Sequence, residues 1–201
     1  MFDVLIIGGG VAGVSCALIL GSAQKKPFAF DKKIAIITHQ KTSFLQQAIF
    51  NNAYGIPAGK LGSELLTESI EQLKQLYPHV CQINEEKVLR IDGNYPTFLV
   101  VTNKNSYKSK NIVVAIGYSN TFAIEGLMKF VENHKKSVPE KNRIQLKNID
   151  HKVAEGIFVA GTLAGYRSQF SIAAGSGASV ATDILTDWND GVHSQCHDKV
   201  Y

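Results

Sequence analysis

The sequence predicts an α/β domain in which helices cover a central parallel β-sheet that also carries a small antiparallel β-meander. Three observations carry this prediction. Short, continuous apolar runs recur along the chain, as in parallel strands that are buried on both faces. Two of these runs, one near each end, pass through a glycine-rich turn into a helical segment. Between them, strand-like segments flank the turn Asp92-Gly93-Asn94, which is typical of antiparallel pairing.

The first 40 residues predict a βαβ unit. The run FDVLIIG at 2–8 is uniformly apolar rather than alternating, which indicates a buried strand. Residues 11–20 predict a helix, and KKIAIIT at 32–38 predicts a second buried strand. The turn between the first strand and the helix contains three consecutive glycines.

The next segment, 39–60, is rich in turn formers and predicts no regular element. A helix is expected to follow, with Ser63 as its N-cap and Pro78 as the residue that stops it. Its apolar residues recur at helical spacing and share one face: Leu66, Ile70, Leu73 and Tyr77.

The second half predicts further strands and one long helix. The expected strands are 80–83, 87–92, 97–102 and 110–117. After a mixed polar stretch, GIFVAG at 156–161 predicts the last buried strand, and a helix rich in Gly, Ala and Ser follows it. We therefore expect a single domain over 1–187 and a polar C-terminal tail over 188–201.

Composition and charge limit the classes of binding partner that we expect. Charged residues make up 19% of the 201-residue chain, and 21 basic against 17 acidic residues give a net charge of +4 without a concentrated basic stripe, so we expect no nucleic-acid groove. No apolar run is long enough to span a bilayer, and the amino terminus does not read as a signal peptide. The three cysteines are widely spaced, which is compatible with a reducing cytoplasm.

The first glycine turn has the spacing Gly8-x-Gly10-x-x-Gly13. This spacing, between a strand and a helix, is typical of Rossmann-like dinucleotide-binding folds. Gly8 permits the tight turn, Gly10 lets a pyrophosphate approach the backbone, and Gly13 lets the helix lie close to the strand. A purely structural glycine turn is the alternative.

The end of the second strand departs from the usual pattern. An acidic residue commonly binds the ribose hydroxyls there, whereas this chain has Thr38, followed by His39 and Lys41. Thr38 could form a weaker hydrogen bond, and His39 or Lys41 could meet a phosphate. An ordinary solvated loop explains the same residues equally well.

A second glycine-rich passage, GIFVAGTLAGYRSQFSIAAGSGASVATDIL at 156–185, is more informative. Here the chain resembles the FAD-binding domain of the thioredoxin-reductase-like pyridine nucleotide–disulfide oxidoreductases, whose corresponding pattern is AGD…RQ…AAGxG. NNAYGIP at 51–57 and VVAIG at 113–117 also resemble family passages, in the same order. The resemblance favours FAD over NAD, because a plain NAD domain would not need the second passage.

The resemblance implies positions for the parts of FAD. The pyrophosphate would lie against Gly8, Gly10, Val11, Ala12 and Gly13. The other positions that it assigns to the cofactor are Thr38 at the adenosine ribose, the Val88 backbone at adenine, Asn52 on the flavin side, Ala115 and Gly117 beside the cofactor, Gly161 and Thr162 at the ribityl chain, and Gln169 and Phe170 beside the isoalloxazine.

Several departures from the family decide the expected chemistry. Thr162 replaces the family's acidic residue, and Ser168 stands where its arginine precedes glutamine, with Arg167 one place earlier. No CxxC occurs, so we expect no disulfide reductase chemistry. The interval 118–155 is too short for an NAD(P)H domain and contains no second GxGxxG.

These features predict a single-domain flavoprotein oxidoreductase that passes electrons from NAD(P)H or a redox partner protein to an unidentified acceptor. The alternatives are a non-enzymatic flavin-binding sensor or docking module, and an enzyme that binds NAD instead. No side chain is expected to act as acid or base. Relatives suggest a homodimer, although no interface is visible in the sequence. His193, Cys196 and His197 lie together in the tail, but they lack the fourth ligand of a zinc site.

Overall fold

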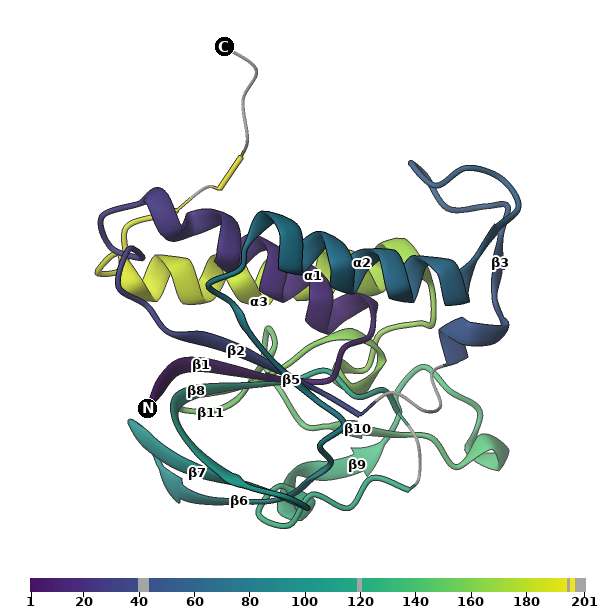
Figure 1. Cartoon of the computed structure of the whole chain (residues 1–201). Helices are drawn as coiled ribbons and strands as arrows, with labels where there is room; N and C mark the ends of the chain where they lie inside the picture. The colour runs from purple at the N-terminus through teal and green to yellow at the C-terminus, as the bar shows by residue number, and fades with distance from the viewer. Residues whose placement is uncertain (40–43, 119–120, 195, 198–201) are drawn as a thin grey trace.

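The structure is a computed structural model of the chain and describes residues 1–39, 44–118, 121–194 and 196–197 (Figure 1). Its centre is an eight-stranded sheet whose main path runs β11-β12-β8-β1-β2-β5. The parallel strands on this path are β1 (Phe2–Ile7), β2 (Ile34–Thr38), β5 (Cys81–Asn84), β8 (Ser106–Val114) and β12 (Ile157–Val159). β11 (Lys152–Ala154) pairs antiparallel with β12 at one edge.

Three helices form a layer over one face of the sheet (Figure 1). They are α1 (Val11–Ser22), α2 (Gly62–Leu76) and α3 (Phe170–Trp188). α1 contacts both other helices, and its contact with α3 is the more extensive of the two. The first and last helices of the chain therefore lie side by side.

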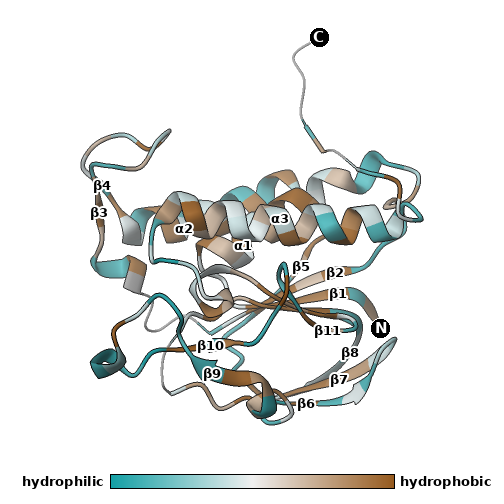
Figure 2. Ribbon diagram, turned by 180° about the vertical axis from the view of Figure 1, so that it is seen from behind, coloured by the Kyte–Doolittle hydropathy of each residue, from teal (hydrophilic) through white to brown (hydrophobic). Residues whose placement is uncertain are grey.

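Antiparallel elements cover the other face. β6 (Val88–Asn94) and β7 (Thr97–Thr102) continue from β8 as the expected meander. β9 (Val131–Asn133) pairs with β10 (Ile144–Leu146) on this side, whereas β3 (Ile49–Phe50) pairs with β4 (Lys60–Leu61) beside α2 (Figure 2). The 3₁₀ turns are η1 (Ala23–Lys25), η2 (Phe44–Gln47), η3 (Met128–Phe130), η4 (Pro139–Lys141) and η5 (Gly161–Ala164).

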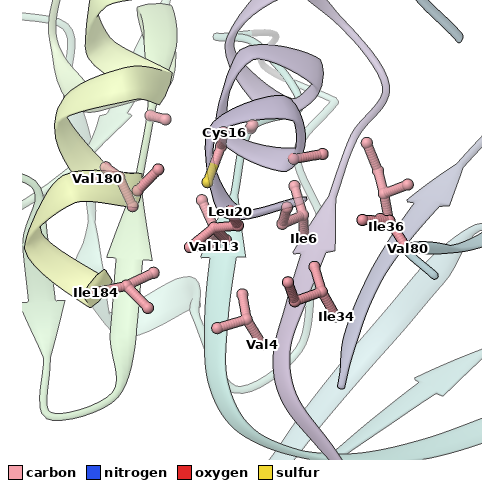
Figure 3. Packing of buried hydrophobic residues seen from close by; sticks show 14 of the residues in the cluster. Val4, Ile6, Cys16, Leu20, Ile34, Ile36, Val80, Val113, Val180 and Ile184 are labelled. Atoms are coloured by element: carbon pink, nitrogen blue, oxygen red, sulfur yellow. The ribbon is translucent and has the colours of Figure 1, made fainter. Parts of the chain in front are cut away.

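The central strands carry continuous apolar runs, such as 4–7 in β1 and 34–37 in β2, because both faces of the sheet are covered. In β1, Val4 and Ile6 point into the cluster beneath the helices, whereas Leu5 and Ile7 point into the cluster above the meander. Figure 2 shows the same arrangement as apolar strands between two more polar outer surfaces. Figure 3 shows the helix-side cluster, in which Cys16 of α1 lies among aliphatic side chains of the sheet and α3.

The predicted strands and helices are confirmed, with boundary differences. α2 begins at Gly62 and not at Ser63, so Ser63 as N-cap was wrong; the Leu61 N–H donates instead to Glu64 Oε2 at 3.3 Å. Lys32 and Lys33 precede β2 rather than belonging to it. The β9–β10 hairpin lies within the polar stretch after Gly117, where no strand was predicted.

Parts of the carboxyl-terminal segment contact the rest of the domain. Trp188 is still helical and packs on the helix-side core. The Cys196 sulfur lies 3.1 Å from Ser22 Oγ at the end of α1. None of the described helices has the length and apolar character needed to cross a membrane.

Candidate functional site

The turn between β1 and α1 is shaped by a close approach to the end of β8. Gly8 has φ of +114°, and a Cβ placed on it would lie 2.4 Å from the Ala115 carbonyl oxygen. Its N–H donates to the Ile37 carbonyl at 2.9 Å, while the Ala115 N–H donates to the Ile7 carbonyl at 2.8 Å. The turn is thus fixed against the carboxyl ends of both neighbouring strands.

Gly10 and Gly13 occupy opposite environments. A Cβ on Gly13 would lie 1.8 Å from the Gly8 carbonyl oxygen, so the fold itself requires glycine there. Gly10 has an ordinary extended backbone with φ of −81°, and no described atom lies within 4 Å of the position of its Cβ. Nothing in the described chain requires glycine at position 10, so its bare backbone suits a ligand.

The same turn opens α1 in a way that suits an anion. Gly10 is the N-cap, no side chain caps the helix, and its first turn contains no acidic residue. The first N–H groups of a helix have no partner within the helix, and the helix dipole is positive there. Residues Gly10 to Gly13 therefore fit a phosphate group.

The carboxyl-terminal glycine passage packs directly on this turn. A Cβ on Gly177 in α3 would lie 2.0 Å from the Ala12 carbonyl oxygen, and one on Gly161 would lie 3.1 Å from Ala12 Cβ. The Gly161 N–H donates to Ser176 Oγ at 2.7 Å, which ties η5 to α3. The two glycine passages, distant in the sequence, thus meet at Ala12.

Gly175 differs from Gly177. It is exposed, and the described chain places no atom within 4 Å of its Cβ position. Close packing within the described chain therefore requires glycine at position 177 but not at position 175. Gly117 resembles Gly175 in having open space beside it, but its φ of +85° independently favours glycine.

The start of α3 meets the segment that follows β2. The Phe170 ring contacts the Phe50 ring edge-on, with centroids 5.3 Å apart. Asn52 lies two residues beyond Phe50 and is exposed, as is Gln169, the N-cap of α3. The structure therefore brings the expected flavin-side residues from two distant segments to the same region.

The expected ribose and adenine residues lie around the end of β2. Thr38 Oγ1 donates its proton to Asn84 Oδ1 at 2.8 Å. The hydroxyl oxygen can therefore accept a hydrogen bond from a ligand but cannot donate one. His39 is exposed, and Lys41 falls outside the described residues. Val88 begins β6, and the Glu86 N–H donates to the Thr38 carbonyl at 3.2 Å, which holds that segment near β2.

His134 holds the loop that contains Thr162. Its Nδ1 accepts the Lys136 N–H at 3.2 Å, so Nε2 carries the proton and donates to the carbonyl oxygens of Thr162, at 3.1 Å, and Tyr166, at 3.2 Å. The imidazole is buried. It therefore fixes the backbone at the position where the family has its acidic residue.

Sequence reasoning missed three contributors to this site. Phe50 lies in the segment for which no regular element was predicted. Ser176 lies within the AAGSG pattern, but no role was predicted for its side chain. His134 gave no signal at all, because its role depends on a hairpin that the sequence did not predict. Only Ser176 could have been found, since a serine between two glycines at a close helix contact can reach a neighbouring backbone group.

The cysteines lie on separate elements. Cys16 is fully buried in α1, and burial raises the pKa of its thiol. Cys81 is exposed on the edge strand β5, and Cys196 lies beside Ser22. The part of the chain that the structure describes contains no group of three His, Cys, Asp or Glu side chains placed to hold a metal.

A family model agrees with this geometry. The model described as pyridine nucleotide-disulphide oxidoreductase matches residues 2–173, which include both the amino-terminal turn and the start of α3. The chain belongs to this family. Membership confirms the resemblance inferred from the two glycine passages.

Curated relatives are longer than this chain. An uncharacterized oxidoreductase CzcO from Bacillus velezensis is 25% identical over 151 residues, which cover 67% of this chain and 41% of the relative. A ferredoxin–NADP reductase from Streptococcus pneumoniae is 28% identical over 117 residues, covering 58% of this chain and 35% of the relative. The chain thus spans less than half the length of these proteins.

Solved structures share the fold. An oxidoreductase from Agrobacterium tumefaciens superposes with a TM-score of 0.74 at 15% identity, covering 92% of this chain and 98% of the other. A thioredoxin reductase from Gloeobacter violaceus gives a TM-score of 0.71 at 14% identity, covering 100% and 98%. The expected Rossmann-like α/β architecture is confirmed.

Proposed function

We propose that the chain binds one FAD molecule between the β1–α1 turn and the start of α3, and passes electrons through it to an acceptor. The carrying observation is the meeting of both glycine passages at Ala12, next to the open space at Gly10. A site built from only one passage would suit NAD equally well. The shared contact supports a longer cofactor that extends from one passage to the other.

The chain's own groups would bind and orient this cofactor. The N–H groups at the start of α1, contributed by Val11, Ala12 and Gly13, suit the pyrophosphate. Thr38 would accept a hydrogen bond from the ribose, because its own proton is donated to Asn84. Gly161 and Thr162, fixed by Ser176 and His134, would bind the ribityl chain.

Gln169 and Phe170 would border the isoalloxazine. A helix N-terminus directed at the ring favours negative charge there and so favours the reduced state. Bound flavin supplies hydride and single-electron transfer, so the chain need only bind, orient and tune it. NAD(P)H or a redox partner protein would supply the electrons.

We further propose that electrons leave without a thiol pair from this chain. Cys16 is enclosed in the core, and Cys81 and Cys196 lie on different elements. A dithiol couple needs two neighbouring accessible sulfurs. We expect Cys16→Ala to leave flavin reduction unchanged while lowering stability; a well-folded variant with a large loss of turnover would contradict this proposal.

A second candidate is a non-enzymatic flavin module that depends on a separate reductase. It is favoured by the connection between β8 and β12, where the described residues form a small hairpin and 3₁₀ turns but no second βαβ unit. A chain of this kind would hold flavin without a dedicated nicotinamide site.

One experiment separates these functions. The protein is purified, incubated with FAD, desalted, and its visible spectrum is recorded before and after anaerobic addition of NADPH or NADH. A yellow protein that bleaches within seconds supports the oxidoreductase. A yellow protein that stays oxidised supports the module. A colourless protein that takes up no FAD contradicts both.

A further inference from the structure

A small cationic pocket lies beside the proposed flavin site. It has a volume of about 120 Å³ and is formed by the β9–β10 hairpin loop together with the loop between η5 and α3.

The residues that line the cationic pocket are Tyr118, His134, Lys136, Arg143, Tyr166, Arg167 and Ser168. They come from the end of β8, from the β9–β10 hairpin loop, and from the loop between η5 and α3.

The pocket gathers positive charge without a matching acid. Two of the chain's three arginines, Arg143 and Arg167, line it together with Lys136. The remaining arginine, Arg90, pairs with Asp92 at 2.7 Å. Among the described residues, no carboxylate lies within ion-pair distance of the three pocket cations, whereas seven ion pairs form elsewhere.

Aromatic rings hold two of these cations in place. The Arg143 guanidinium lies 4.3 Å from the centroid of the Tyr118 ring, and Lys136 Nζ lies 5.4 Å from the centroid of the Tyr166 ring. Cation–π contacts of this kind orient a positive charge without neutralising it. The buried His134 imidazole fixes the backbone of both loops beneath them.

Two residues that line the pocket are neighbours in sequence of residues assigned to the proposed flavin site. Ser168 directly precedes Gln169, the N-cap of α3, and Tyr118 directly follows Gly117. Successive Cα atoms are about 3.8 Å apart, so both walls of the pocket continue into residues assigned to the cofactor. A molecule anchored in the pocket would therefore extend toward the isoalloxazine.

We infer that this pocket binds one oxyanionic group, a carboxylate or a phosphate, of the molecule that exchanges electrons with the flavin. Pockets that enclose whole ligands measure roughly 300–1,000 Å³, so a pocket of this size suits a single group. Guanidinium groups bind carboxylate and phosphate oxygens with paired hydrogen bonds. The oxyanion site rests on the pocket alone, and its role in electron exchange rests on the proposed function.

The test is calorimetric titration of the FAD-loaded protein with inorganic phosphate and, separately, with acetate, at constant ionic strength. Loading with FAD fills the site at the β1–α1 turn, so that turn cannot account for the signal. The variant is Arg143→Gln/Arg167→Gln. The control is Lys74→Gln/Lys108→Gln, which removes the same charge from exposed positions outside the pocket.

We expect saturable binding by the wild type and the control, and binding at least about 10-fold weaker by the arginine variant. Stronger binding of phosphate would indicate a phosphorylated molecule, and stronger binding of acetate a carboxylate. Absence of saturation in the wild type, or equal binding by the arginine variant, would overturn the oxyanion site. Circular dichroism checks that the variant is folded.

The flavin spectrum tests the second half of the inference. Occupation of the pocket should shift the visible absorption bands of the bound flavin in the wild type but not in the arginine variant. Saturable binding without a spectral shift would contradict the link to electron exchange. If the protein takes up no FAD, the proposed function fails, while titration of the colourless protein still tests the oxyanion site.

Discussion

Gly10 and Gly13 lie three residues apart, yet a side chain at each would meet different surroundings. At Gly13 a Cβ would lie 1.8 Å from a backbone oxygen, whereas at Gly10 it would enter open space. We expect Gly10→Val to fold normally and to lose FAD, because the valine would occupy the space proposed for the pyrophosphate. Visible absorbance per mole of protein and thermal unfolding measure the two effects separately.

Gly13→Ala is the matched comparison. Overpacking against a fixed backbone atom destabilises by about 1–3 kcal/mol or more, so this variant should unfold at a lower temperature whether or not FAD is present. A Gly10→Val protein with full FAD content would exclude the pyrophosphate from this turn.

Glu86 provides a residue-scale test by pH. Burial opposes its ionisation, but hydrogen bonds from Thr102 Oγ1 (2.6 Å), Asn105 Nδ2 (2.7 Å) and the Tyr107 hydroxyl (2.9 Å) outweigh it. The pKa of Glu86 therefore lies below its ordinary value. The carboxylate joins the loop between β5 and β6 to β7 and β8, next to the end of β2.

A carboxyl group with a lowered pKa stabilises the fold above its unfolded-state pKa, and this stabilisation is lost as pH falls through the folded-state pKa. We expect Glu86→Gln to lower the free energy of unfolding by about 1–3 kcal/mol near neutral pH. The difference from the wild type should shrink in acid. Urea unfolding of both proteins across the acidic range measures it, and a difference independent of pH would contradict the assigned role.

At the scale of elements, the contact between α1 and α3 depends on one small residue. A Cβ on Gly177 would lie 2.0 Å from the Ala12 carbonyl oxygen, so Gly177→Ala should force the helices apart. We expect destabilisation of about 1–3 kcal/mol or more by thermal or urea unfolding.

Gly175→Ala, on the same helix, is the control. No described atom lies near its Cβ position, and replacing a helical glycine by alanine stabilises by about 0.5–1 kcal/mol. If this variant is stable but retains less FAD, the space beside Gly175 belongs to the cofactor. Equal destabilisation by both substitutions would refute the close-contact explanation for Gly177.

The strands that could be predicted from the sequence share one physical property. β1, β2, β8 and β12 are buried on both faces, so their apolar runs were unambiguous. β9 (VEN) and β10 (IQL) span three residues each and mix apolar with polar residues, so neither forms a continuous apolar run like that of β12. The start of α2 was misplaced because the Leu61 N–H donates to Glu64 Oε2, so the helix begins without a serine cap.

At the scale of the whole molecule, the glycine passages could be predicted as one site because each carries its own spacing signal. The cationic pocket could not, because Arg143 and Arg167 come from loops that only the folded chain brings together. The role of His134 could not be predicted for the same reason. Local spacing in the sequence indicated the two glycine passages. The convergence of side chains from separate loops became visible only in the three-dimensional structure.

If FAD joins both ends of the chain, it should stabilise the entire fold. A ligand at about 1,000 times its dissociation constant adds about 4 kcal/mol to the free energy of unfolding. We expect FAD to raise the unfolding temperature of the wild type and to leave that of Gly10→Val unchanged. Hydrogen exchange should slow both in the first turn of α3 and in the β1–α1 turn; slowing in only one of them would contradict a shared site.

The position of Ala12 between Gly161 and Gly177 also bears on the order of biosynthesis. β1 and α1 are translated before η5 and α3. Until they emerge, the nascent polypeptide has half of a binding surface and an uncovered flank of α1. If the proposed site is correct, cofactor capture must therefore await synthesis of α3, and termination before α3 would yield a product unable to retain its nucleotide.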